Sequence, residues 1–157
     1  MKNNDSVLKA ASIFLNISLG IFLLWIFGAV LTVILNPELN RLPKELAIVI
    51  SLAGGSLILY ILISLKLIVK TIRQNNPFCT ENIKRFKTIG YSIFIIGVLN
   101  AVLNFPGNND GANLIATPYG SIKFGIFIYI VLGFLALVLA EVFAEAARIK
   151  NENDMTI

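Results

Sequence analysis

The chain has 157 residues, of which 57% are hydrophobic and only 14% are charged, with a formal net charge of +4. Its mean hydropathy of +0.82 excludes an ordinary soluble domain, and the apolar segments leave no room for one beside them. The single cysteine, Cys79, excludes an intramolecular disulfide, and the absence of histidine removes the commonest general base and metal ligand. We therefore expect residues 1–157 to form a single all-α integral membrane domain with no cofactor and no metal.

Four apolar segments are long enough, or nearly so, to cross the hydrocarbon core, which takes about 20 residues for roughly 30 Å. They cover about residues 9–35, 46–65, 88–105 and 121–140. The first segment is too long for the core of a signal peptide, and no small-residue cleavage site follows it, so we interpret it as a retained span. The pattern predicts a polytopic membrane protein folded as a four-transmembrane-helix bundle.

The distribution of lysine and arginine predicts the orientation, because short cytoplasmic loops carry an excess of both. With four spans, the two termini share a side with the loop between the second and third spans. That side holds ten of the 13 basic residues, and the other side holds Arg41, Lys44 and Lys123. Both termini of this multi-pass protein are therefore predicted to be cytoplasmic.

The apolar interiors of the four spans contain no Asp, Glu, Lys, Arg or His. This argues against a drug/proton antiporter, whose coupling needs an ionisable group near the midplane, and leaves a passive pore open. Asn100 and Asn104 are four residues apart and share a helix face, and Asn16 lies in the first span. We interpret these three asparagines as packing residues that form hydrogen bonds between helices, in preference to a ligand site.

Small residues mark the faces on which the helices are expected to approach closely. Ala53-Gly54-Gly55-Ser56 lies midway along the second span, Gly90 and Gly97 lie on the third, and Gly125 and Gly133 lie on the fourth. Such contacts form either within the bundle or between the protomers of a homo-oligomer.

The loop between the second and third spans reads KLIVKTIRQNNPFCTENIKRFKTIG. Asn75-Asn76-Pro77 predicts a turn, and Thr80 is expected to cap a helix that begins at Glu81. The basic residues after this turn either hold the orientation on anionic lipid headgroups, which we favour, or form a docking platform for an acidic partner. These basic residues are Lys84, Arg85 and Lys87.

The fourth helix is predicted to be longer than the membrane is thick. Nothing breaks a helix between Ser121 and Asn151, which gives roughly 45 Å of helix against a core of about 30 Å. The excess is expected to project about two to three turns into the cytoplasm.

The projecting part carries two parallel features. A charged stripe recurs at i, i+4, i+7 and i+11, and consists of Glu141, Glu145, Arg148 and Glu152. An apolar strip beside it consists of Val142, Ala146 and Ile149. The charged stripe either closes against the chain's own basic loop or is presented, with the tail, to another protein, and the sequence leaves both interpretations open.

The loop NPFCTENIKRFKTIGY, the ending AEVFAEAARIKNENDMTI and the four-span layout together resemble an uncharacterised bacterial family, the domain of unknown function 2975. Its two markers are the Asn-Pro-Phe-x-x-Glu-Asn loop, here residues 76–82, and the Glu-Asn-Asp-x-Thr-Ile ending, here residues 152–157. Ala146 departs from a glycine that is common in relatives, which implies a stiffer helix. The family has no established activity. Its members are often encoded beside a small helix-turn-helix regulator, and this implies that the membrane protein binds the regulator and keeps it away from DNA.

The leading hypothesis is a non-enzymatic protein of the bacterial cell membrane that binds or sequesters a cytoplasmic helix-turn-helix regulator, without contacting nucleic acid itself. The residues expected to make that contact are Glu141, Glu145, Arg148, Glu152, Asp154, Met155, Ile157, Lys84, Arg85 and Lys87. The alternative is a small transporter, a channel or an immunity protein against a membrane-active peptide, which would use the face of Asn100 and Asn104. An enzyme is not expected, because no nucleophile has a neighbouring base.

Overall fold

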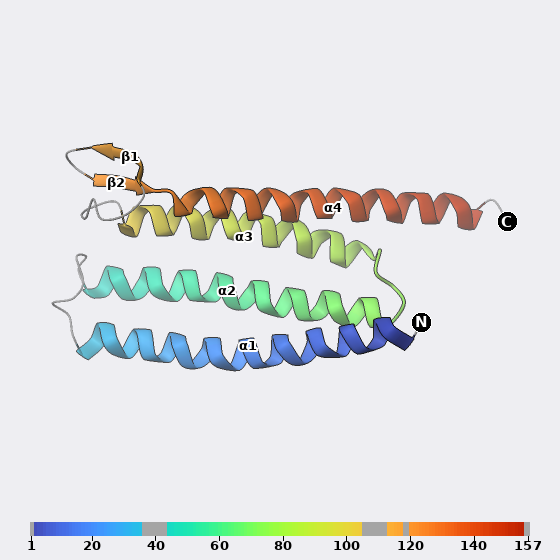
Figure 1. Cartoon of the computed structure of the whole chain (residues 1–157), viewed down its shortest axis with the longest axis horizontal. Helices are drawn as coiled ribbons and strands as arrows, with labels where there is room; N and C mark the ends of the chain where they lie inside the picture. The colour runs from blue at the N-terminus through green and yellow to red at the C-terminus, as the bar shows by residue number, and fades with distance from the viewer. Residues whose placement is uncertain (1, 36–43, 105–112, 118–119, 156–157) are drawn as a thin grey trace.

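The computed structural model describes residues 2–35, 44–104, 113–117 and 120–155. Its long helices are α1 (Lys2–Leu35), α2 (Lys44–Arg73), α3 (Thr80–Asn104) and α4 (Gly125–Met155). All four are long and apolar enough to cross a membrane, which confirms the predicted all-α, four-span architecture. Both termini lie at the same end of the molecule as the α2–α3 connection (Figure 1), and we call this the terminal end.

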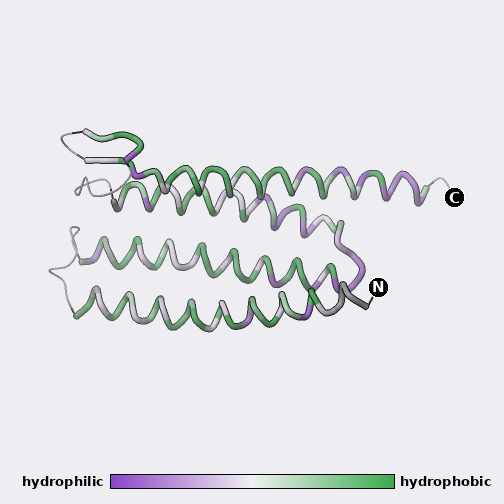
Figure 2. The backbone as a smooth tube through the Cα atoms, viewed as in Figure 1, coloured by the Kyte–Doolittle hydropathy of each residue, from purple (hydrophilic) through white to green (hydrophobic). Residues whose placement is uncertain are grey.

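The hydrophobic surface of the four helices identifies a membrane protein. Figure 2 shows hydrophobic residues along most of each helix, with hydrophilic residues gathered toward the terminal end of α3 and α4. Large apolar side chains such as Trp25, Phe27 and Phe134 are exposed on this surface. Because a soluble protein rarely leaves so much apolar surface uncovered, we assign it to contact with the lipid bilayer.

Each helix packs chiefly against its neighbour in sequence, α1 on α2, α2 on α3 and α3 on α4. The α3–α4 pair is brought together by glycines, as the small-residue pattern predicts. A Cβ atom added to Gly90 would lie 2.9 Å from the carbonyl oxygen of Gly133, and one added to Gly97 would lie 2.8 Å from the Cβ of Tyr129. The two backbones therefore approach more closely than side chains would allow.

The other predicted small-residue contacts have mixed outcomes. Gly55 is buried and faces Ile26 of α1, where an added Cβ would lie 2.8 Å from the end of that side chain. Gly54 and Gly125, in contrast, have no atom within 4 Å of an added Cβ. Gly125 is the first residue of α4, so it lies at the start of the helix and not at a helix contact.

A β-hairpin precedes α4, and the sequence interpretation missed it. Strand β1 (Asn113–Thr117) pairs antiparallel with β2 (Gly120–Lys123). The prediction that the fourth helix starts at Ser121 is therefore wrong, since Ser121 lies in β2 and α4 begins at Gly125. β-Branched residues in 113–123 favour strands, and the Thr117 hydroxyl closes the hairpin by donating to the Gly120 carbonyl at 2.7 Å.

The predicted turn after α2 is confirmed, and it is a Schellman motif. The N–H of Asn76 donates to the carbonyl of Thr71 at 3.0 Å, and the N–H of Asn75 donates to that of Ile72 at 3.0 Å. Asn75 takes the left-handed conformation, with φ of 58°, which asparagine tolerates better than most residues. Pro77 follows and cannot continue the helix.

The start of α3 differs by one residue from the prediction. The helix begins at Thr80, so Cys79 takes the capping position that the sequence suggested for Thr80. The Cys79 carbonyl accepts hydrogen bonds from the N–H groups of Asn82 at 3.0 Å and Ile83 at 3.4 Å. Glu81 lies in the first turn, where its carboxylate meets the positive end of the helix dipole.

Candidate functional site

The α2–α3 connection is organised around Asn82, the last residue of the first family marker. Its side chain is fully buried, with 0% exposure. The amide nitrogen donates to the Thr71 hydroxyl at 2.7 Å and to the Pro77 carbonyl at 2.8 Å, and the amide oxygen accepts from Arg85 at 2.8 Å. One side chain thus ties the end of α2, the turn and the start of α3 together.

Three phenylalanines then attach this connection to α4. The ring of Phe143 on α4 lies 5.5 Å from that of Phe78 in the connection and 4.9 Å from that of Phe86 on α3, measured between centroids. These distances and the tilted geometries are typical of favourable aromatic pairs. Ile68, Ile89 and Ala136 form the buried core just inside this layer. The terminal end is therefore a packed structure and not a loose set of loops.

The three basic residues predicted to meet a partner lie in three different environments. Arg85 is held by Asn82, as described above, and has a structural role. Lys87 forms an ion pair with Glu141 of α4, with 2.9 Å between the nitrogen and the oxygen. Lys84 is exposed. Arg85 and Lys87 are thus engaged with the chain itself, and the contact of the three residues with a partner stays a prediction.

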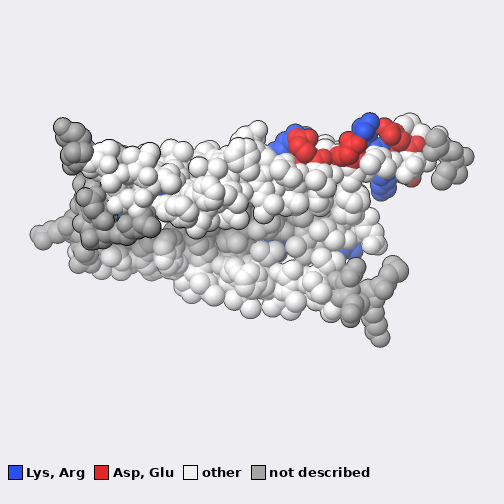
Figure 3. Space-filling view, turned by 45° about the horizontal axis from the view of Figure 1, so that its top comes forward, with Lys and Arg blue, Asp and Glu red and all other residues white. Residues whose placement is uncertain are grey.

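The charged stripe of α4 is confirmed as one continuous row. The Arg148 guanidinium donates to the Glu145 carboxylate at 3.1 Å and to the Glu152 carboxylate at 3.3 Å. Figure 3 shows these acidic and basic atoms gathered along the projecting end of the molecule, while the rest of the visible surface is almost free of charge. The row lies past the hydrophobic body of the four helices (Figures 1 and 2).

The two interpretations of this stripe each apply to a different part of it. Glu141, at the inner end, closes against the chain's own Lys87. Glu145, Arg148 and Glu152 pair with one another and stay exposed. The inner end thus fixes α4 to α3, and the outer three residues present a charged surface.

The apolar strip is exposed over the same stretch of helix. Val142 is 55% exposed and Ile149 is 49% exposed, and Met155 at the end of the helix is 79% exposed. Asp154 follows Glu152 by two residues and so lies about 200° round the helix from it, away from the stripe. Ile157, which the sequence also places in this contact surface, lies outside the described residues.

The pairing of Glu145 with Arg148 has a measurable consequence. A helix needs about 20 residues to cross the bilayer core, and Glu145 lies beyond that length of α4. Its hydrogen bond with Arg148 lowers the pKa of the Glu145 carboxyl below the ordinary value of 4.5, with the positive charge of Arg148 adding to the effect. Because the folded-state pKa is lowered, the pair stabilises the helix end above pH 4.5 and loses this effect as pH falls through the folded-state pKa.

We expect a carboxyl-carbon NMR titration to show the pKa of Glu145 rising toward 4.5 in an Arg148→Gln variant. A Lys150→Gln variant removes an equal charge from the opposite side of the helix and serves as the control, because it leaves the hydrogen bond intact. An unchanged pKa in Arg148→Gln would contradict the pairing in solution.

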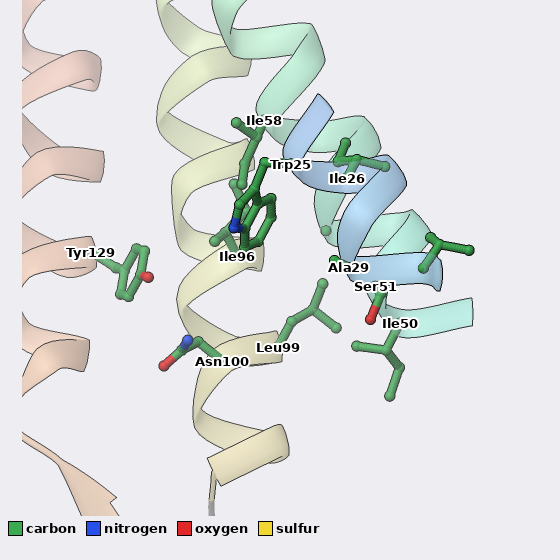
Figure 4. A pocket seen from close by; sticks show the side chains of 13 residues that line it. Trp25, Ile26, Ala29, Ile50, Ser51, Ile58, Ile96, Leu99, Asn100 and Tyr129 are labelled. Carbon is green, nitrogen blue, oxygen red and sulfur yellow. The ribbon is translucent and has the colours of Figure 1, made fainter. Parts of the chain in front are cut away.

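A second candidate site is a pocket of about 280 Å³ in the half of the molecule away from the terminal end. All four helices line it, with Trp25 on α1, Ser51 on α2, Asn100 on α3 and Tyr129 on α4 (Figure 4). Apolar side chains and the two glycines Gly54 and Gly55 make up most of the remaining wall. A few polar groups on a mainly apolar wall are the usual composition of a small-molecule site.

The intramembrane asparagines are only partly accounted for. Asn100 lines the pocket, Asn16 is exposed on α1, and the side chain of Asn104 lies outside the described part of α3. Their role in helix packing stays a prediction. Within the described ranges, no three Cys, Asp or Glu side chains gather closely enough to hold a metal ion.

Sequence reasoning did not assign the roles of Asn82, Phe78 and Phe143. The available signal was the position of Asn82, a polar residue in the family marker among the first residues of a helix. Its partners lie up to 11 residues away in sequence, and the Phe143 contact joins residues more than 50 apart. Such pairs become visible only when the helices are placed side by side.

Comparison with known proteins tests the resemblance. No curated protein and no solved structure gave a match. The model of the family described as protein of unknown function DUF2975 matches residues 35–157, which include α2, α3, the hairpin and α4 but leave out all of α1 except its last residue. Both sequence markers, in the α2–α3 connection and at the end of α4, fall inside this match. The chain therefore belongs to the DUF2975 family of membrane proteins of unknown function.

Proposed function

We propose that this protein binds or sequesters a cytoplasmic helix-turn-helix transcriptional regulator through the projecting end of α4. The observation that carries the proposal is the exposed Ile149 of the apolar strip, which lies beside the exposed Glu145, Arg148 and Glu152 of the charged stripe past the hydrophobic body. Ile149 and Met155 lie beyond the about 20 residues of α4 that the bilayer core requires, so a soluble partner can cover them. An amphipathic helix of this kind is suited to lie in a groove of a soluble partner.

The charge of this segment fits a DNA-binding partner. Residues 141–155 carry four carboxylates and two cations, a net charge of −2. The DNA-contacting face of a regulator is basic, so an acidic helix is complementary to it and competes with DNA for the same surface. Exposed ion pairs contribute only about 0–1 kcal/mol each, so the charges set specificity and the apolar side chains supply most of the affinity.

The proposal centres on α4 and gives the basic loop a smaller part. Arg85 and Lys87 are engaged with Asn82 and Glu141, so both are needed to hold the terminal end together. Lys84 is the exposed member of the three and is the remaining candidate for a second contact. Removing Arg85 or Lys87 would therefore test the structure of the site more than its contact with a regulator.

The test measures binding of a purified, fluorescently labelled regulator of the small helix-turn-helix type, which the family resemblance implies, to the full chain in nanodiscs. Glu145→Gln/Glu152→Gln neutralises the two carboxylates at the exposed end of the stripe, and Ile149→Asn removes part of the apolar strip. We expect each to weaken binding about tenfold, in line with the loss of about 1.4 kcal/mol. The control, Asn151→Lys/Asp154→Asn, raises the net charge by the same two units away from the stripe and should bind normally.

A second measurement connects binding with regulation. Adding the full chain in nanodiscs should release the regulator from its operator DNA, and the Ile149→Asn variant should release less. Absence of binding by the unaltered protein would contradict the proposal. Equal weakening by the stripe variant and its charge-matched control would contradict the assignment of the stripe.

The pocket supports a second candidate function, a small transporter, a channel or an immunity protein against a membrane-active peptide. Asn100 and Tyr129 place polar groups in a mainly apolar cavity between helices, which is where an apolar ligand with one polar group would bind. Under this function an Asn100→Ala variant loses solute flux or protection against the peptide. Under the docking function the same variant binds the regulator normally, so the two functions are separable.

A further inference from the structure

A groove of about 860 Å³ lies between α1 and α2 toward the terminal end. Ser12 and Leu19 of α1 form one wall, and the other is formed by residues at the end of α2 and by Gln74 just past it. This groove is separate from the pocket between all four helices, because the two share no lining residue. Nothing in the proposed docking function uses it.

The residues that line the groove differ in polarity between its two ends. Ile63 and Leu19 lie at the end nearer the centre of the molecule, and Leu67 and Val69 then alternate with Lys66 and Lys70 along α2. The end nearer the terminal end is polar, with Gln74 as the last residue. A molecule with an apolar chain and a polar head, lying parallel to the helices, matches this gradient.

Three cations line the polar part of the groove. Lys66, Lys70 and Arg73 recur at i, i+4 and i+7 on α2, which places them on one face along about 10 Å of helix. None of these three cations forms an ion pair with another residue in the part of the chain that the structure describes. Three like charges on one face repel each other, so an anion between them is strongly favoured.

We propose that this groove is a binding site for an anionic phospholipid, with the phosphate held by Lys66, Lys70 and Arg73 and an acyl chain along Leu19, Ile63 and Leu67. Basic pockets between membrane helices are suited to anionic headgroups. A zwitterionic lipid such as phosphatidylcholine should bind less tightly, because its choline offsets the negative charge of its phosphate. The lipid fills a space that α1 and α2 do not close by themselves.

The test is native mass spectrometry of the full chain in detergent with equal amounts of phosphatidylglycerol and phosphatidylcholine. We expect the unaltered protein to retain phosphatidylglycerol about tenfold in preference to phosphatidylcholine, because each basic residue attracts the anionic headgroup and salt screens part of this attraction. The variant Lys66→Gln/Lys70→Gln/Arg73→Gln should lose this preference. The control Lys84→Gln/Lys123→Gln/Lys150→Gln removes three exposed cations elsewhere and should keep it.

Two further measurements distinguish lipid binding in the groove from nonspecific electrostatic attraction of anions. A Ser12→Phe variant fills the groove without changing charge and should lower retention of phosphatidylglycerol, with circular dichroism to verify that the helices are intact. Inorganic phosphate should give no adduct at the concentration at which the lipid saturates the groove, because phosphate lacks an acyl chain. Equal loss in both triple variants, unchanged retention in Ser12→Phe, or phosphate bound as tightly as the lipid would each overturn the proposal.

Discussion

Replacing Gly90 with alanine is expected to destabilise the protein by about 1–3 kcal/mol, the usual cost of inserting a methyl group into a closed contact. The added Cβ would lie 2.9 Å from the Gly133 carbonyl oxygen and 2.9 Å from the Leu137 side chain. Leu137 can rotate, but a backbone oxygen cannot move unless α3 and α4 separate. The substitution therefore acts on the whole helix pair.

Thermal unfolding in detergent, followed by circular dichroism and by reaction of Cys79 with a thiol reagent, measures this effect. Gly54→Ala is the matched control, because nothing lies within 4 Å of its added Cβ and alanine is the better helix former. We expect Gly54→Ala to be neutral or slightly stabilising. A Gly90→Ala protein as stable as the control would mean that α3 and α4 do not pack through this glycine.

Replacing Asn82 with alanine is expected to have a comparable or larger effect, about 2–3 kcal/mol. The change removes the fully buried amide that serves as partner to the Pro77 carbonyl and the Arg85 guanidinium, which are themselves half-buried. Each buried polar group left unsatisfied costs about 1–3 kcal/mol. Because Phe78 lies in the same connection, its contact with Phe143 should loosen too.

Asn82→Asp separates the contributions at this position. The carboxylate keeps the acceptor for Arg85 but cannot donate to the Thr71 hydroxyl or the Pro77 carbonyl, so we expect an intermediate loss. Asn76→Ala is the control, because Asn76 is exposed and the hydrogen bond found for it comes from its backbone N–H, which alanine retains. Equal stability of Asn82→Ala and Asn76→Ala would contradict the stabilising role of Asn82 in the α2–α3 connection.

These two positions also affect how the proposed function is tested. A substitution in the family marker at residues 76–82 that abolishes regulator binding would do so by releasing α4 from its contact with Phe78 and Phe86. Variants at Ile149 and Glu152 act beyond that contact and leave the fold of the terminal end in place. Comparing the unfolding temperature of each variant with its binding therefore distinguishes a lost surface from a lost structure.

Local sequence patterns are sufficient to predict the four membrane-spanning helices, the turn at residues 75–77 and the charged stripe of α4. These depend on local properties, namely the length of apolar runs, the conformational limits of asparagine before proline, and the spacing of charges along one helix. The hairpin before α4 was missed because its strands are short and depend on pairing with each other, which composition and length do not reveal.

The contacts between side chains of different helices depend on how the helices pack, and local patterns do not predict them. Lys87 closes on Glu141, Arg85 turns to Asn82, and Glu145 with Glu152 stays on the outer surface with Arg148. The pocket lined by Asn100 and the groove lined by Lys66, Lys70 and Arg73 also depend on how the helices pack. The physical reason is that periodicity fixes the face of a helix on which a residue lies, whereas its partner depends on the rotation and depth at which two helices pack, and here glycine contacts set both for α3 and α4.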